Sequence, residues 1–311
     1  MTEAIYQEVS VKTEKAKEQH RRISVCGMLK YLDVSRSGYR AWQRREPSEQ
    51  QKHREAMKMR IKEKYEASKG IYGAPKITQE LRQEGEHISE RTVGLYMRQM
   101  GLRAIWVKHW TVTTKDSDFS HKLRNYLGEH FNPGKPNAVW CTDITYIWTD
   151  GGFVYLTSVM DLYARRIIAW TLSRTMEVEH VVSAIEQAKR RRKLSNPLII
   201  HSDRGSQYVS AEFRKAVTGM KHSFSKKAYP WDNACIESFH SLIKREWLNR
   251  FKIKDYEHAR RLVFEYIESF YNTVRIHSHC DYMSPVQFEK LYQKCYMKAQ
   301  MQPRKQKFVL R

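Results

Sequence analysis

The sequence predicts an α/β fold, a five-stranded mixed sheet with flanking helices, preceded by an all-α region. Two observations support this prediction. After Asn137, short runs of β-branched and aromatic residues alternate with amphipathic helical segments in the order β-β-β-α-β-α-β-α. Before residue 104, the apolar residues recur mainly at helical spacing.

Residues 1–50 contain a pair of short helical segments. Residues 23–31 have an apolar helical period, and after a brief turn Ser35 can cap a second helix that carries Arg36 and Arg40. This is the length of a helix-turn-helix, in which Arg36 and Arg40 are the candidate DNA contacts. Helix pairs are common, so this pattern alone is a weak signal.

Residues 51–104 predict a second and better formed helix-turn-helix. Ser89 can cap a helix whose apolar residues, starting at Val93, follow an i, i+3, i+4, i+7 period. The opposite face of that helix offers Arg91 and Arg98 as DNA contacts. The alternative is a helical hairpin that packs on the core or on another subunit.

The second half of the chain contains the predicted sheet. Residues 105–136 are polar and end in a loop rich in Pro, Gly and Asn, so we expect a linker there. Residues 137–296 are the predicted core with its C-terminal helices, and 297–311 form a loose basic tail. Gly151-Gly152 can turn the first hairpin of an antiparallel meander. Helices are expected at 178–193, at AEFRKAV, at 232–248 (opened by Asp232) and at 254–272, and two further strands at LSNPLIIHSD and HSFS.

The composition favours a polyanionic partner. Lys and Arg total 56 against 34 Asp and Glu, a formal net charge of +22, and the excess is spread over both halves of the chain. Nucleic acid is the commonest such partner, and the alternative is a merely basic surface.

Several classes of protein are disfavoured. No apolar stretch approaches the roughly 18 residues that suggest a membrane span, and the N-terminus lacks an apolar signal core. Five widely spaced cysteines without a CxxC pair indicate neither a zinc ribbon nor a disulfide framework. We therefore expect no membrane partner and a reducing cytoplasm.

Three acids of the second half are the candidate functional residues. Asp143 lies in the first predicted strand, Asp203 ends the fourth, and Glu237 lies in the last helix, so the three carboxylates could meet at one sheet edge. Such a cluster is costly without a cation, because like charges raise each other's pKa. Mg²⁺ suits these ligands, and two ions about 4 Å apart would activate an attacking oxygen and stabilise a leaving one on a phosphodiester. Lys244, two helical turns from Glu237, could hold a DNA phosphate beside them.

Each acid also has a simpler explanation. Asp143 could pair with an Arg, Asp203 could cap a helix or hold a turn, and Glu237 could be a solvated helix acid. Other acids in the same region compete for the role, and the strongest is Asp161 beside Arg165 and Arg166. The remaining competitors are Asp150, Glu212, Asp232 and Glu246.

At these residues the chain resembles a known family, the second-frame (OrfB) proteins of IS3-family insertion sequences, which are DDE transposases. The matching stretches cover roughly residues 20–290. They are VSRSGYRAW, GIYGAPKI, the helix pair to MGL, WCTDITYI, YLTSVMDLYARRIIAW, HSDRGSQYVS, WDNACIESFHSLIKRE, and YNTVRIH followed by SP.

The resemblance implies a site. The fold would be an RNase H-like core of the retroviral-integrase type, with Asp143, Asp203 and Glu237 as metal-binding catalytic carboxylates and Lys244 as the basic residue after the Glu. The ions would be two Mg²⁺, with Mn²⁺ as a substitute. The segment between Asp203 and Glu237 is two residues shorter than is usual in the family.

The resemblance also implies a reaction and partners. Metal-activated water frees a 3′-OH at an element end, and that hydroxyl attacks a second phosphodiester without a covalent enzyme intermediate. The first joining bridges the two element ends on one strand, and a circular form then integrates into target DNA. The partners would be double-stranded DNA, the upstream-frame (OrfA) protein or a fusion with it, and further copies of the chain on DNA, at the bacterial nucleoid.

Two other functions stay open at this stage. The first is a metal-dependent nuclease of the same core fold that cleaves without joining, and the second is an inactive DNA-binding relic. All three predict salt-dependent DNA binding, so only the chemistry separates them.

Overall fold

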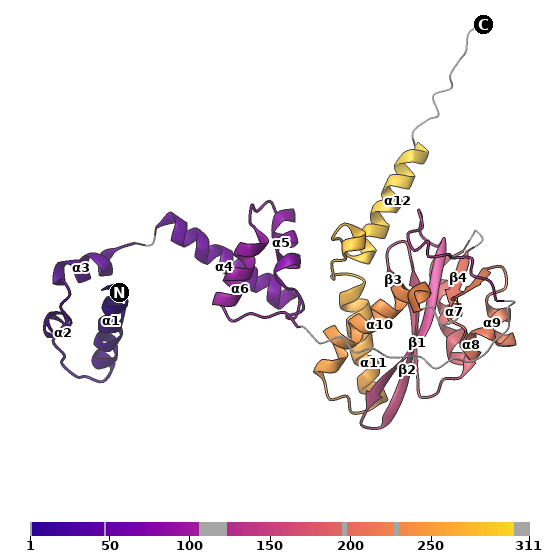
Figure 1. Ribbon diagram of the computed structural model, residues 1–311, viewed down its shortest axis with the longest axis horizontal. Coiled ribbons are helices and arrows are strands. Elements are labelled where there is room, and N and C mark those ends of the chain that lie inside the picture. Colours follow the sequence, from indigo (N-terminus) through magenta and orange to yellow (C-terminus); the bar gives the residue numbers. More distant parts are fainter. Residues whose placement is uncertain (1, 47, 106–122, 195–197, 227–229, 302–311) are drawn as a thin grey trace, which may run out of the picture. The chain divides into compact units, whose positions relative to one another are not determined.

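A computed structural model describes residues 2–46, 48–105, 123–194, 198–226 and 230–301 (Figure 1). The chain divides into two compact units, residues 1–63 and 64–311. The polar segment HWTVTTKDSDFSHK and residues 302–311 of the predicted tail lie outside the described residues. The predicted boundaries at residues 50, 104, 136 and 296 stay predictions.

The first unit is helical. It contains α1 (Thr2–Glu18), α2 (Val25–Tyr31), α3 (Arg36–Arg44) and the start of α4 (Glu49–Ala67), which ends in the second unit. The Ser35 side chain accepts a hydrogen bond from the Gly38 N–H, so Ser35 caps α3 as predicted. A small core of Tyr6, Val9, Leu29 and Tyr39 joins the first three helices.

The second unit opens with the predicted helix pair. It consists of α5 (Ala74–Gln83) and α6 (Glu90–Gln99), with Ser89 capping α6 through the Thr92 N–H. Val93 and Met97 are buried on α6, as the apolar period predicts. Gly101 has φ +70, a left-handed conformation that favours glycine, directly after the helix ends.

The second unit also contains the predicted mixed sheet, with strand order β3-β2-β1-β4-β5. The strands β1 (Val139–Thr149), β2 (Gly152–Asp161) and β3 (Arg166–Ser173) form the antiparallel meander. The strands β4 (Ile199–Ser202) and β5 (Lys221–Phe224) run parallel to β1, and α7 (Val178–Arg192) makes the crossover to β4. The first and fourth strands are therefore neighbours, which is the arrangement that lets Asp143 and Asp203 lie side by side.

Helices cover both faces of the sheet. On one side α7, α8 (Ser206–Val209) and α9 (Ala211–Ala216) pack on a core that includes Trp140, Val159 and Ile200 (Figure 1). On the other side lie α10 (Ala234–Glu246) and α11 (Tyr256–Phe264). The remaining elements are the 3₁₀ turns Pro230–Asn233, Leu248–Arg250 and Ser278–Cys280, the π-helical segment Glu265–Tyr271, and α12 (Pro285–Met301).

Three local expectations need correction. Asp232 does not open the last core helix, since α10 begins at Ala234 and the Asp232 carboxylate instead accepts hydrogen bonds from the Lys226 N–H at 2.6 Å and the Asn125 amide at 2.8 Å. The helix expected over 254–272 changes to π-helical geometry at Glu265. Finally, α12 continues to Met301, so the first residues of the expected loose tail are helical.

The described part of the expected linker packs on the sheet. Leu127 is buried, and the N–H groups of Tyr126 and Leu127 both donate to the Ser223 hydroxyl on β5, at 2.9 and 3.0 Å. Although its composition is polar, the segment around Leu127 packs against β5, the edge strand of the sheet.

Candidate active site

The sheet register places two of the three predicted acids side by side. In the parallel pair of β1 and β4, Cys141 lies opposite His201, and Asp143 and Asp203 each follow two residues later. Burial and the neighbouring Asp143 charge raise the pKa of Asp203 to about 6. The two carboxylates are therefore close enough to repel each other.

Glu237, in the first turns of α10, joins this pair from above the sheet. Burial of the carboxyl group, then the charges of Asp143 and Asp203, raise the pKa of Glu237 to about 7. Glu237 also keeps much of its surface exposed to solvent, which screens the interaction. The structure thus brings all three acids together, although the segment between Asp203 and Glu237 is shorter than is usual in the family that the sequence resembles.

Hydrogen bonds hold the two aspartates in place. One carboxylate oxygen of Asp143 accepts from the Ile144 N–H at 2.8 Å, and the other lies 3.3 Å from Nδ1 of His240. Asp203 accepts from the Gly205 N–H at 2.9 Å, so it also holds the turn that its simpler explanation proposed. These bonds orient the carboxylates but leave some of their lone pairs free for a ligand.

His240, which the sequence did not indicate, also contacts the cluster. It is buried on α10, one helical turn after Glu237, and its Nε2 lies 3.2 Å from the Ser158 hydroxyl on β2. Ser158 is the cross-strand partner of Asp143, so the three side chains share one face of the sheet. The i+3 spacing from Glu237 was the available signal.

Lys244 lies beside the acids, as its spacing from Glu237 predicts. Burial lowers the pKa of Lys244, while the Asp143 charge raises it. Its ammonium group lies 4.4 Å from the centroid of the Tyr146 ring on β1. The cation is thus held at the cluster by an aromatic contact as well as by charge.

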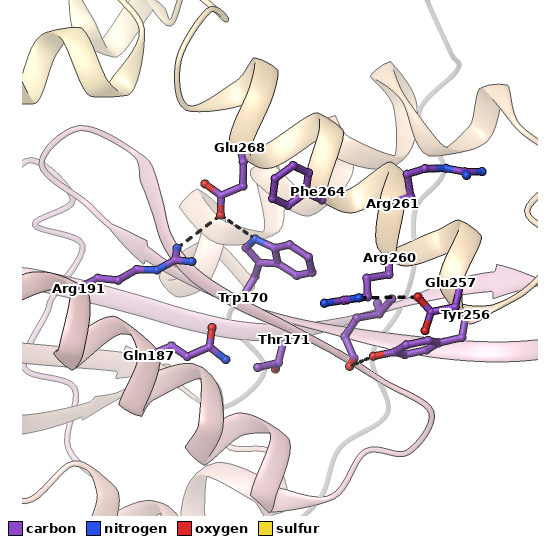
Figure 2. A pocket seen from close by; sticks show the side chains of 11 residues that line it. Trp170, Thr171, Gln187, Arg191, Tyr256, Glu257, Arg260, Arg261, Phe264 and Glu268 are labelled. Atoms are coloured by element: carbon purple, nitrogen blue, oxygen red, sulfur yellow. Dashed lines mark hydrogen bonds and ion pairs between the residues drawn. The ribbon is translucent and has the colours of Figure 1, made fainter.

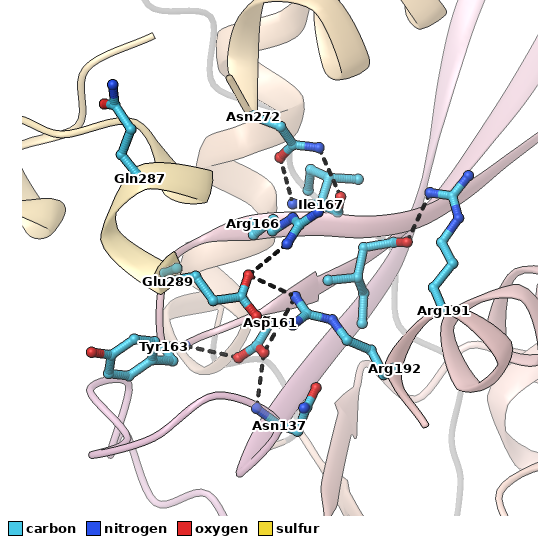
Figure 3. A network of polar contacts seen from close by, with 12 residues as sticks. Asn137, Asp161, Tyr163, Arg166, Ile167, Arg191, Arg192, Asn272, Gln287 and Glu289 are labelled. Carbon is cyan, nitrogen blue, oxygen red and sulfur yellow. Dashed lines mark hydrogen bonds and ion pairs between the residues drawn. The ribbon is translucent and has the colours of Figure 1, made fainter. Parts of the chain in front are cut away.

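The strongest competing acid, Asp161, has a structural role (Figure 3). It is buried, accepts from the N–H groups of Asn137 and Tyr163 at 2.9 and 3.0 Å, and lies 3.7 Å from Arg192. Arg192 in turn pairs with Glu289 of α12. Both carboxylate oxygens of Asp161 are therefore engaged within the protein, which indicates a structural role.

A sizeable cavity lies away from the acids. It has a volume of about 530 Å³ and opens beside β3, between α7 and α11, where Glu268 lies between Arg191 and Trp170 (Figure 2). None of the three clustered carboxylates lines it. The candidate site is therefore the carboxylate cluster where β4 ends beside the interior of β1.

The donor set of the cluster fits a hard divalent cation. Three carboxylates converge in a chain whose other charges are mainly basic, and burial, followed by the charges of the neighbouring acids, raises the pKa values of Asp203 and Glu237. Within the described ranges, no three His, Cys, Asp or Glu side chains already stand in a metal-binding arrangement. A bound ion would have to draw the carboxylates closer together.

The predicted DNA-contacting arginines are all exposed. Arg36 and Arg40 line a shallow groove on α3, and Arg91 and Arg98 project from α6. Exposure makes them available to a partner, but their contact with DNA stays a prediction. No helix in the described part of the chain is long and apolar enough to cross a membrane.

Comparisons with known proteins match the two regions of the chain separately. The Integrase core domain family matches at residues 133–230, and a second Integrase core domain family matches at 218–285. An HTH-like domain family matches at residues 52–110, around the helix pair of α5 and α6.

Curated relatives extend over nearly the whole chain. It is 36% identical to the transposase InsF for insertion sequence IS3A of Escherichia coli K12, over 88% of this chain and 96% of the relative. It is 37% identical to the transposase for insertion sequence element IS904 of Lactococcus lactis, over 79% of this chain and 98% of the relative. A solved integrase catalytic core from HTLV-2, in complex with magnesium, matches 50% of this chain with 19% identity and a TM-score of 0.40.

The identity to curated transposases extends from the helix-turn-helix-like region through the core. The sheet order, the crossover and the integrase family match agree on an RNase H-like core of the integrase type. The chain therefore belongs to the transposases of IS3-family insertion sequences, DNA-acting enzymes with an integrase-type core.

Proposed function

We propose that Asp143, Asp203 and Glu237 are the catalytic carboxylates of this transposase and that they bind two Mg²⁺ ions. The proposal is supported by the register of β1 and β4, which places Asp143 and Asp203 at matching positions two residues beyond the Cys141–His201 pair. Glu237 lies close enough to both that their charges add to burial in raising its pKa. When bound, the ions would activate water and stabilise the leaving oxygen at a DNA phosphodiester.

The protein's own groups would supply orientation and charge. The Ile144 N–H and His240 hold the Asp143 carboxylate, and the Gly205 N–H holds that of Asp203. Lys244 would bind the phosphate beside the reacting one. Positioning and charge stabilisation are the main contributions a protein makes to phosphoryl transfer.

The partners belong to the same proposal. An HTH-like domain implies DNA binding, and exposed Arg36, Arg40, Arg91 and Arg98 are the proposed contacts. We propose that the chain acts as an oligomer on double-stranded DNA in the cytoplasm, at the nucleoid. An upstream-frame protein, separate or fused, would contribute to end recognition.

A strand-transfer assay tests this proposal. Purified protein, with and without the upstream-frame partner, is incubated with Mg²⁺ and labelled DNA that carries the element ends. We expect Asp143→Asn, Asp203→Asn and Glu237→Gln each to lower joining by at least about a thousandfold, because each removes a charge that the transition state needs. DNA binding should persist in all three variants.

Glu212→Gln is the matched control, since Glu212 is an exposed acid on α9 outside the cluster. Wild-type joining in any of the three variants would remove that residue from the site. Cleavage without joining by the wild type would favour the nuclease. Intact DNA binding without chemistry would favour the inactive relic.

A further inference from the structure

An exposed aromatic surface lies next to the carboxylate cluster. Tyr146, Trp148 and Phe153 are 50%, 62% and 47% exposed, although each is a large apolar side chain. Trp148 and Phe153 are cross-strand partners in the hairpin of β1 and β2, and Tyr146 lies two residues earlier, so the three side chains share one face. We call these three residues the aromatic face.

The rings form one connected surface. Phe153 lies 5.3 Å from Tyr146 and 4.8 Å from Trp148 between ring centroids, and its plane stands at 80° and 75° to theirs. Single exposed apolar residues are ordinary on a protein, whereas a contiguous group marks a binding surface.

The hairpin that carries the aromatic face is firmly anchored. On the opposite face of the same strands, Ile147 and Val154 are buried. In the turn, the Thr149 hydroxyl donates to the Gly152 carbonyl at 2.7 Å, and the Asp150 N–H donates to the Ile253 carbonyl at 2.8 Å. The rings are therefore presented on a rigid support, which limits the entropy lost on binding.

Basic groups border the aromatic face. The Lys244 ammonium lies 4.4 Å from the Tyr146 ring centroid, and exposed Lys252 lies 3.7 Å from Asp150 in the hairpin turn. Lysine is depleted in protein–protein interfaces, whereas grooves for single-stranded nucleic acid combine basic groups with stacking rings. The surroundings therefore favour a nucleic acid strand over a second protein.

Resting on the proposed active site, we propose that the aromatic face binds unpaired bases of the DNA strand next to the reacting phosphodiester. Tyr146 and Trp148 lie three and five residues beyond Asp143, which is about 10 and 17 Å along a strand. Strand alternation turns Asp143 to the other face, and Lys244, which contacts the Tyr146 ring and senses the Asp143 charge, connects the two. That distance corresponds to about three to five nucleotide steps of 3.4 Å. The bases must be unpaired there, because a duplex hides their flat faces from a protein ring.

The test compares two DNA substrates with full-length protein. One carries a fully paired element end, and the other has mismatches over the bases beside the cleavage position. In Trp148→Leu/Phe153→Leu, which keeps apolar side chains but removes two rings, we expect cleavage of the paired end to fall at least about fivefold. Cleavage of the mismatched end should change by less than about twofold, because its bases are already unpaired.

Two variants serve as controls. Trp148→Phe/Phe153→Tyr keeps both rings and should restore cleavage of the paired end. Phe264→Leu removes a ring that is 53% exposed on α11, outside the hairpin, and should leave both substrates unaffected.

A fluorescence measurement separates this inference from the proposed active site. With 2-aminopurine beside the cleavage position, stacking on the aromatic face should quench the base in wild-type protein and equally in Asp203→Asn. Quenching should be lost in Trp148→Leu/Phe153→Leu. Unchanged quenching in that variant overturns the inference even if the carboxylates are catalytic, and quenching in Asp203→Asn supports it even if they are not.

One further result would show that the aromatic face binds a second copy of the chain and not DNA. If Trp148→Leu/Phe153→Leu sediments as a smaller species and loses activity on both DNA substrates alike, the aromatic face is an interface between copies of the chain. That outcome overturns the inference.

Discussion

At the scale of single residues, the least expected feature is the contact between His240 and Asp143. Ser158 can donate its hydroxyl proton to Nε2 of His240, which leaves the ring proton on Nδ1 to be donated to Asp143. A partner of this kind fixes the orientation of a proposed metal ligand, and its loss commonly costs about 10–100-fold in metal affinity or activity.

We therefore expect His240→Leu to lower DNA cleavage about 10–100-fold without unfolding the protein. His240→Asn should recover part of the loss, since its amide can still donate to Asp143. A second readout, the rise in melting temperature on adding Mg²⁺, should weaken in the Leu variant and recover in the Asn variant. A loss of activity that the Asn variant does not relieve, with an unchanged response to Mg²⁺, would contradict the positioning role.

A second prediction at this scale concerns His222 on β5, which contacts Ser202 at the end of β4. Burial lowers the pKa of His222 to about 4, and its Nε2 lies 3.0 Å from the Ser202 hydroxyl. His222 is thus neutral when folded and takes up a proton near pH 6.5 only on unfolding. Its contribution to stability is complete above pH 6.5 and is lost as the pH falls toward 4.

His222→Phe should therefore flatten the fall in stability between pH 7 and 4.5 by on the order of 1 kcal/mol. Urea unfolding at both pH values, with metal chelated, measures this effect. The raised pKa values of Asp203 and Glu237 make the folded state more stable as the pH falls, which opposes the effect of His222. The effect of His222 is therefore read from the difference between the pH profiles of wild type and variant. Parallel pH profiles of the two proteins would show that His222 does not carry the effect.

At the scale of elements, α6 presents two chemically distinct faces. Val93 and Met97 are buried, while Arg91 and Arg98 are exposed on the other side. The apolar face anchors the helix, and the basic face is free for a polyanion.

If both arginines contact phosphates, Arg91→Ala/Arg98→Ala should reduce the salt slope of DNA binding by about 2. Fluorescence anisotropy with labelled element ends across a salt series measures this slope. Arg91→Lys/Arg98→Lys keeps both charges and should retain the slope. An unchanged affinity and slope in the alanine variant would mean that this face of α6 does not touch DNA.

At the scale of the whole molecule, buried ion pairs join the C-terminal helix to the sheet. Glu289 on α12 is almost fully buried and pairs with Arg192 of α7 and, at 2.7 Å, with Arg166 at the start of β3 (Figure 3). Removing Glu289 leaves the half-buried Arg166 without its carboxylate and the buried Arg192 with only Asp161, 3.7 Å away, which is strongly destabilising.

Glu289→Leu should accordingly lower the free energy of unfolding by about 3 kcal/mol. Thermal or urea unfolding provides the measurement, and Lys290→Ala, at the exposed neighbouring position, is the control that should change little. A Glu289→Leu variant as stable as the wild type would show that α12 is held by its apolar contacts instead.

Much of the local structure was predictable. Capping by Ser35 and Ser89, the left-handed Gly101 that follows α6, and the order of strands and helices depend on residues within one or two turns of each other. The positions of Asp143, Asp203 and Glu237 in their strands and helix made them candidates among several acids, and the resemblance to the family motifs selected them.

Only the tertiary structure shows which hydrogen-bond or ion-pair partner each polar group has. The sequence could not separate Asp161, held by Arg192 and two backbone N–H groups, from Asp143, held by His240, because both lie in strands near basic residues. Likewise, the packing of Leu127 and the role of Asp232 depend on contacts about a hundred residues away. Local patterns determine helices, strands and caps through short-range hydrogen bonds and periodicity, whereas desolvation and pairing of charges depend on which distant residues the sheet brings together.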